Sequence, residues 1–223
     1  TSWGGFYNAG QVCTSVERVY VFDNIADQFT EALVAEAKKV KLGDPMVKGT
    51  DVGPMSSKMQ FSNTVNKVDL AKKEGARVLT GGQPAEQFEK GYFYEPTVFD
   101  QVTPEMEIMN EEAFSPVIPI QKVKSIEEAI ELSNSTKYGL GCSIFTRDIE
   151  RAMKAADEIQ AGTFCINSPL MENIAAPFGG MKQSGIGREH GIEGLEEFRE
   201  AKHIYMDYNH SNKDWWFHHR EES

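Results

Sequence analysis

The 223-residue sequence has little positive charge and no long apolar run. It contains 23 lysines and arginines against 34 aspartates and glutamates, which gives a formal net charge of −11. Because phosphate groups and anionic lipids are contacted through basic faces, this charge argues against a nucleic-acid partner and against docking on a membrane. No run of about 18 apolar residues occurs, so the sequence predicts no transmembrane helix.

Cysteine is also scarce. Cys13, Cys142 and Cys165 are widely spaced and form neither a CxxC pair nor the spacing of zinc ligands. An odd number of isolated cysteines does not suggest a disulfide framework, so we expect a reducing compartment and a cytoplasmic protein. His218 and His219 are adjacent but have no carboxylate or thiol cluster beside them, so no metal site is predicted.

The start of the sequence lacks a methionine, and its first charged residue is Glu17. A signal peptide needs a basic start and a continuous apolar stretch, whereas residues 1–16 contain glycines and polar amides. We therefore expect this sequence to have been cut from within a larger protein.

Helical and strand-like segments alternate along the chain. Apolar residues recur at helical spacing over 25–40, 56–74 and 148–159, and a capping box at Ser125 and Glu128 announces a further helix. Asp23 or Asn24 is expected to cap the first helix, and Gly75 to end the second. Five β-rich runs lie between them: 18–22, 77–80, 117–123, 142–146 and 162–166. This alternation predicts an α/β fold with a mostly parallel twisted sheet and flanking helices.

Residues 203–208 alternate near the end of the chain, with Ile204, Met206 and Tyr208 on one face. This is a strand pattern. Because a terminal strand has unpaired N–H and C=O groups, it must pair or be protected. It could close a sheet within its own chain or pair with another chain.

Three features suggest chemistry, and each also has a plain structural explanation. Cys13 follows a small, uncharged stretch, and could be a nucleophile or a small buried hydrophobe. Residues 111–116 combine carboxylates with an aromatic ring, and could hold a ribose and a heterocycle or form an acidic loop. Residues 177–191 hold five glycines, which indicates unusual backbone angles or close approach. That stretch matches neither a P-loop nor a dinucleotide fingerprint.

Taken together and in order, the motifs resemble the C-terminal catalytic part of the aldehyde dehydrogenase superfamily, from about residue 6 to residue 208. The matching stretches are 6–13 (FYNAGQVC), 43–45 (GDP) with 52–54 (VGP), 91–98 (GYFYEPTV), 111–117 (EEAFSPV), 138–140 (YGL), and 177–180 (PFGG) with 182–185 (KQSG).

The resemblance implies an NAD- or NADP-dependent oxidation of an aldehyde to an acid, with Cys13 as the nucleophile. It implies that Glu112 holds the nicotinamide ribose, that Phe114 packs the nicotinamide end, and that Gln60 makes a further cofactor contact. Phe178 and the loop 168–173 would form the wall of the substrate tunnel; Met171 and Glu172 belong to that loop.

The resemblance also implies a domain arrangement. Residues 1–201 would be the catalytic domain and residues 202–223 an oligomerisation strand and tail of a dimer or tetramer. The cofactor-binding domain, the general-base glutamate and the oxyanion-hole asparagine of the family precede this part, so we expect the 223 residues alone to be inactive.

Two other functions stay open at this stage. A cysteine hydrolase would need an imidazole beside Cys13, and all five histidines lie at or after His190. A non-catalytic scaffold could keep the fold and the oligomer surface without activity.

Overall fold

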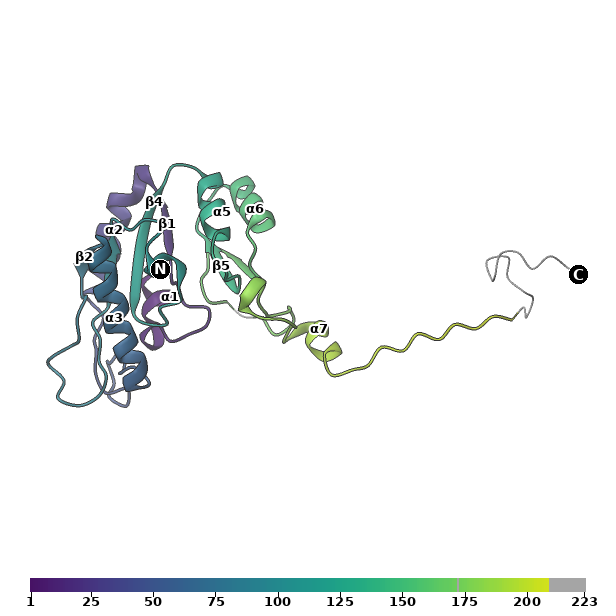
Figure 1. Ribbon diagram of the computed structural model, residues 1–223, viewed down its shortest axis with the longest axis horizontal. Helices are drawn as coiled ribbons and strands as arrows, with labels where there is room; N and C mark the ends of the chain where they lie inside the picture. The colour runs from purple at the N-terminus through teal and green to yellow at the C-terminus, as the bar shows by residue number, and fades with distance from the viewer. Residues whose placement is uncertain (172, 209–223) are drawn as a thin grey trace, which may run out of the picture.

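The computed structural model describes residues 1–171 and 173–208 (Figure 1). Its α-helices are α1 (Ser2–Phe6), α2 (Asp23–Ala37), α3 (Lys58–Glu74), α4 (Glu107–Asn110), α5 (Ile126–Asn134), α6 (Ile149–Glu158) and α7 (Gly191–Glu196). Two 3-10 helices are η1 (Tyr7–Gly10) and η2 (Lys182–Ser184). The strands are β1 (Val19–Phe22), β2 (Arg77–Thr80), β3 (Thr97–Asp100), β4 (Val117–Val123), β5 (Gly141–Ile144) and β6 (Thr163–Ile166).

The strands form one sheet of four and one of two. The larger sheet has the order β1-β4-β3-β2, in which β4 runs parallel to β1 and β3, and β2 is antiparallel to β3. β5 and β6 pair in parallel and lie with α5 and α6 beside the larger sheet (Figure 1). The predicted α/β fold with a mostly parallel sheet is therefore confirmed.

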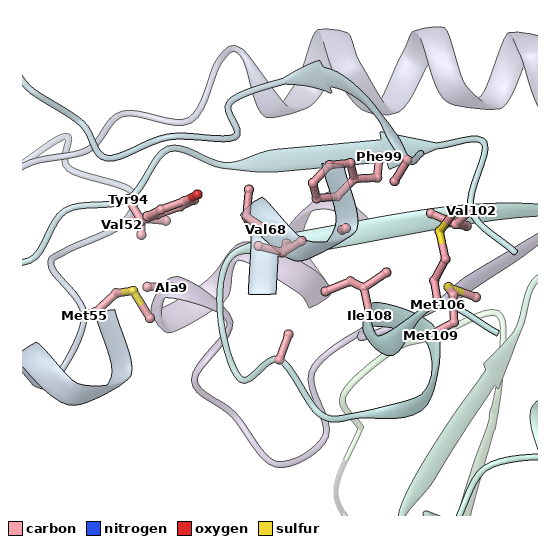
Figure 2. Close-up of a cluster of buried hydrophobic side chains, with 14 residues drawn as sticks. Ala9, Val52, Met55, Val68, Tyr94, Phe99, Val102, Met106, Ile108 and Met109 are labelled. Carbon is pink, nitrogen blue, oxygen red and sulfur yellow. The ribbon is translucent and has the colours of Figure 1, made fainter. Parts of the chain in front are cut away.

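The core lies on both faces of the larger sheet. Because successive strand residues point to opposite faces, Phe99 and Val117 join one buried cluster, whereas Val98 and Ile118 join the other. α3 packs on the first cluster through Val68 (labelled in Figure 2) and Ala71, and α2 packs on the second through Ala26 and Leu33. The central strand β4 is buried at six of its seven positions, which explains its nearly continuous apolar sequence.

The predicted helix ends are largely confirmed. Gly75 ends α3 with a φ of 107°, a left-handed angle that glycine adopts readily. The Ser125 side chain accepts a hydrogen bond from the N–H of Glu128 at the start of α5. The expected cap at Asp23 or Asn24 is wrong: α2 begins at Asp23 itself, directly after β1, and its N-cap is Phe22, which makes no capping bond. No loop residue separates the strand from the helix, so no polar cap is placed there.

Several elements lie outside the predicted set, namely α1, α4, α7 and β3. α1 contains Gly4 and Gly5, which favour other conformations in isolation. At Gly5, a Cβ atom would approach the side chain of Ile118 to 2.5 Å, so close packing explains the glycine. Tertiary packing therefore determines this short helix.

Residues 200–208 run away from the rest of the described chain (Figure 1). The strand expected at residues 203–208 is not formed within this chain, because no described strand lies beside it. Pairing with another chain stays a prediction. Residues 209–223, with His218 and His219, lie outside the described residues, and so does Glu172. In the described ranges, no helix is both long enough and apolar enough to cross a bilayer.

Candidate active site

Cys13 is exposed on a loop that follows an unusual turn. Asn8, Ala9 and Gly10 adopt successive left-handed φ angles of 52°, 58° and 70°, a conformation that costs free energy for residues other than glycine. Asn8 Nδ2 donates to the carbonyl of Gln11 at 3.0 Å, and Gln11 Nε2 donates back to the carbonyl of Asn8 at 3.2 Å. These reciprocal bonds shape the loop that presents Cys13.

The turn is also anchored in the core. Ala9 is buried in the cluster that contains Met55 and Tyr94 (Figure 2). Phe6, at the end of α1, is buried in the cluster on the opposite face of the sheet. The residues before Cys13 are thus held on both sides of the sheet.

The Cys13 loop packs against the segment 111–116. A Cβ atom at Gly10 would lie 2.0 Å from the carbonyl oxygen of Ser115, so only glycine fits there. On the other side of Cys13, the Glu17 carboxylate accepts the N–H groups of Ala113 and Phe114, at 2.8 Å and 2.9 Å. The structure therefore brings the predicted nucleophile and the predicted ribose-binding segment together.

Gln60 lies beside the same segment, although its observed contacts are with backbone. From the first turn of α3, its Nε2 donates to the carbonyl of Ala113 at 3.0 Å and to that of Phe114 at 2.8 Å. Glu112, which precedes these two residues, is exposed, and Phe114 is half-buried.

The segment is held at its start by a charged pair. Lys137 Nζ lies 2.7 Å and 2.8 Å from the two carboxylate oxygens of Glu111, and the Tyr138 hydroxyl donates to Glu111 at 3.1 Å. The hydrogen bond from Lys137, followed by that from Tyr138, holds the pKa of Glu111 below its usual value. Glu111 is therefore occupied by structural partners, which leaves Glu112 as the available carboxylate.

The glycine-rich stretch 177–191 packs against the residues that follow Tyr138. The N–H of Met181 donates to the carbonyl of Gly139 at 2.8 Å, and the Ser184 hydroxyl accepts the N–H of Gly139 at 2.8 Å. Gly185, Gly187 and Gly191 have positive φ angles. At Gly179 and Gly180, a Cβ atom would approach neighbouring backbone to less than 3 Å. Unusual angles and close approach, which the sequence indicated as alternatives, therefore both occur in this stretch, at different glycines.

The remaining resembling stretches adjoin the same loop. Gln11 Oε1 accepts the N–H of Ser56 at 2.9 Å, and the N–H of Met55 donates to the carbonyl of Tyr92 at 2.9 Å. Residues 55 and 56, directly after the stretch 52–54, are therefore bonded to the stretch 91–98 and to the turn before Cys13, respectively.

The predicted substrate residues are not brought to Cys13 by any described hydrogen bond or ring contact. Phe178 pairs with Glu189 through two backbone hydrogen bonds of 2.7 Å, and its ring lies 6.1 Å from that of His190. Met171 is 57% exposed. Pro169 of the same loop lies beside Gly4 of α1, so the loop does adjoin the helix that leads to the turn.

The other two cysteines lie in strands, as predicted. Cys142 is in β5 and Cys165 is in β6. Burial raises the pKa of the Cys142 thiol to about 11. A thiol with that pKa is almost entirely protonated at neutral pH, and the thiolate is the reactive form.

Sequence reasoning missed Glu17, Lys137 and Tyr138. The isolated carboxylate at Glu17, after sixteen uncharged residues, was the signal that could have marked it. Its partners lie almost 100 positions away, so the sequence pattern alone could not identify them.

Comparison with known proteins finds relatives that match nearly the whole chain. A sequence model described as the aldehyde dehydrogenase family matches residues 1–204. The peroxisomal aminoaldehyde dehydrogenase 1 of Pisum sativum is 41% identical over 204 residues, which are 92% of this chain and 41% of that protein. The betaine aldehyde dehydrogenase of Brucella anthropi is 39% identical over 206 residues, 92% of this chain and 42% of that protein.

Solved structures show the same likeness. Betaine aldehyde dehydrogenase from Staphylococcus aureus, in complex with NAD+, superimposes with a TM-score of 0.89 at 39% identity, over 96% of this chain and 43% of that one. The NAD+ complex of an aldehyde dehydrogenase from Bacillus cereus gives a TM-score of 0.89 at 43% identity, over 93% and 42%. The chain thus spans about two fifths of the length of these four proteins.

Proposed function

This chain belongs to the aldehyde dehydrogenase family, and on that premise we propose that it serves, within its natural protein, to oxidise an aldehyde to a carboxylic acid with NAD or NADP. The observation that carries the proposal is the packing of the Cys13 loop against the segment that bears Glu112 and Phe114. A nucleophile beside a cofactor-binding segment is what covalent oxidation of an aldehyde requires.

The proposed chemistry starts at Cys13. Its thiolate sulfur forms a bond to the aldehyde carbon, and the electron pair of the C=O bond moves to oxygen, where the N–H of Cys13 donates a hydrogen bond. The product of this attack is a thiohemiacetal. NAD or NADP, when bound, would be the oxidant that accepts a hydride from its carbon. The resulting thioester would then be cleaved by water to the acid and the free thiol.

The residues near Cys13 suit a nicotinamide nucleotide. Glu112 is exposed and can accept hydrogen bonds from ribose hydroxyls, while the half-buried Phe114 offers a ring to a flat heterocycle. Gln60 is proposed as a further contact beside them. The NAD+ complexes of the S. aureus and B. cereus proteins support NAD as the cofactor. A related S. aureus structure carries a BME-modified cysteine, which supports a reactive thiol in that protein.

For the substrate we propose a small polar aldehyde that contacts Phe178, Met171 and Glu172. Relatives named for betaine aldehyde and aminoaldehydes support this class. We further propose a cytoplasmic homo-oligomer, a dimer or tetramer, with residues 1–201 as the catalytic domain and 202–223 as the oligomerisation segment. Relatives include cytosolic proteins as well as the peroxisomal one from pea.

We also propose that the 223 residues alone do not turn over. The family resemblance assigns no residue of this chain as the general base for thioester hydrolysis or as the oxyanion-hole amide. Proton transfer and orientation by positioned groups contribute several orders of magnitude to the rate. Without those groups, we expect the 223 residues to show no measurable turnover.

The test uses the natural protein at full length. Purified protein is mixed with NAD or NADP and with betaine aldehyde, aminoaldehydes and simple aliphatic aldehydes, and the formation of reduced nicotinamide is followed by its absorbance. Cys13→Ala should abolish turnover, whereas the matched control Cys165→Ala should retain it. Full activity of Cys13→Ala would remove Cys13 as the nucleophile.

A non-catalytic scaffold is the second candidate, because Ile186 is fully exposed and Phe198 is 91% exposed. Ile192 and Leu195, which lie between them in the sequence, are also more than 60% exposed, and such a run of exposed apolar side chains favours a surface that another chain covers. Absence of nicotinamide reduction by the full-length protein with every aldehyde would favour the scaffold. A cysteine hydrolase has no comparable support, because Cys13 makes no hydrogen bond to the histidines that the structure describes, His190 and His203.

A further inference from the structure

Glu17 is a half-buried residue four positions after Cys13, and nothing in the proposed chemistry uses its carboxylate. Its two oxygens accept one N–H each, Oε2 from Ala113 and Oε1 from Phe114. Burial raises the pKa of Glu17, and repulsion by the Glu112 carboxylate adds to this, while the two N–H groups and Arg18 act in the opposite direction. Glu112 directly precedes Ala113, whose N–H donates to Glu17, so the backbone next to Glu112 is bonded to the Glu17 side chain.

Gln60 acts on the same two residues from the other side. Its side-chain nitrogen donates to both carbonyls, so the N–H and C=O groups of Ala113 and Phe114 are all bound by two side chains. Backbone groups buried at such a place need partners, and here neither helix nor sheet supplies them. The two side chains together form what we call the 113–114 clamp.

The clamp holds a strained backbone. Phe114 has a φ of 48°, in the left-handed region that a bulky residue adopts only when its surroundings enforce it. Glu112 precedes the clamp and follows Glu111, which Lys137 and Tyr138 fix. The exposed Glu112 side chain is therefore presented by a backbone that is held on both sides.

We infer that Glu17 is a positioning residue for hydride transfer: through the 113–114 clamp it fixes the places of Glu112 and Phe114 relative to Cys13. The inference rests on the proposed function and deepens it. Glu17 and Cys13 belong to one short segment of chain. The side chain that holds Ala113 and Phe114 is therefore kept at a fixed separation from the proposed nucleophile. Displacements of about 1 Å in such geometry can slow a reaction by about two orders of magnitude.

The test compares Glu17→Gln with wild type in the full-length protein. Glutamine has the same shape but offers only one acceptor oxygen, so one of the two N–H groups loses its partner. We expect single-turnover hydride transfer to slow about tenfold or more and the KM for NAD to rise, while the rate of Cys13 alkylation by iodoacetamide changes less than about twofold. Glu31→Gln, on the exposed face of α2, is the matched control and should behave as wild type.

A second variant reaches the clamp from its other side. Gln60→Leu removes both donors, and because it acts on the same two residues, the double variant with Glu17→Gln should be less impaired than the product of the single effects. Amide hydrogen exchange gives a readout besides activity: protection of Ala113 and Phe114 should fall about tenfold in Glu17→Gln and not in Glu31→Gln.

The outcomes separate the two proposals. Unchanged hydride transfer in Glu17→Gln would overturn the positioning role and leave the proposed function intact. Parallel losses of hydride transfer, Cys13 alkylation and global stability would show a purely structural residue and would also overturn it. If wild type oxidises no aldehyde with NAD or NADP, the proposed function fails and the positioning role falls with it.

Discussion

The α-carbon of Gly10 lies so close to the carbonyl of Ser115 that a Cβ atom at Gly10 would be 2.0 Å from the oxygen. This contact joins the loop of the proposed nucleophile to the segment of the proposed ribose ligand. It leaves no space for any side chain.

Gly10→Ala should therefore lower the free energy of unfolding by about 2 kcal/mol or more, because it adds a backbone clash to the left-handed penalty of about 1–2 kcal/mol. Gly49→Ala is the matched control, since Gly49 has a φ of 96° with nothing within 4 Å of its Cβ position. Urea denaturation measures both. Equal losses in the two variants would show that the contact with Ser115 is unimportant.

Cys13 should be the first of the three thiols to react with limiting iodoacetamide. It is exposed, whereas Cys142 has a pKa raised to about 11 by burial and Cys165 lies within β6. Peptide mapping after partial modification measures the order. Preferential labelling of Cys142 or Cys165 in the folded protein would contradict the assignment of Cys13.

Glu112→Gln in the full-length protein should slow hydride transfer about tenfold with little change in Tm, because the side chain is exposed and its backbone is held by neighbours. Stopped-flow measurement of reduced nicotinamide and thermal unfolding report the two effects. Glu131→Gln, exposed on α5, is the control. An unchanged single-turnover rate would remove Glu112 from the site.

Glu17 should make stability depend on pH. Its pKa is raised in the folded protein, so the carboxyl contributes most to stability below its unfolded pKa of about 4.5, and this contribution is lost as pH rises through the folded pKa. Wild type should thus lose stability relative to Glu17→Gln as the pH rises above about 4.5. Chemical denaturation of both proteins across this range tests the sign, and a constant difference would contradict the shift.

Residues 202–208 should mediate self-association. Ile204, Tyr205 and Met206 are each more than 60% exposed, and the segment pairs with no strand of its own chain within the described ranges. Sedimentation of the chain with and without residues 202–223 measures the effect. We expect association only in the longer form; a monomer in both forms, near crystallisation concentrations, would refute the interface.

The sequence was informative wherever local pattern decides structure. The helical spacing of α2 and α3 and the apolar run of β4 depend on their own residues, so they could be predicted within a few positions. α1 and β3 could not, because a glycine-containing helix and a four-residue strand take their form from the sheet against which they pack.

The residues of the candidate site also fall into those that the sequence could identify and those that it could not. Cys13, Glu112 and Phe114 could be named because they stand in motifs that resemble a known family. Glu17 stands between the nucleophile and the strand-like run 18–22, where a carboxylate is usually solvated. Its role depends on bonds to residues 113 and 114, which only the folded chain brings near.

The bonded residues are far apart in the sequence, and this separation bears on the order in which the chain folds. The two bonds of Glu17 span 96 and 97 positions, and those of Gln60 span 53 and 54. Contacts that close such long loops cost chain entropy, so we expect these bonds to form together with the pairing of β1 and β4, which joins residues at a similar separation, and after the local helices. A nascent or partly folded chain would therefore carry the Cys13 thiol before the 113–114 clamp has formed beside it.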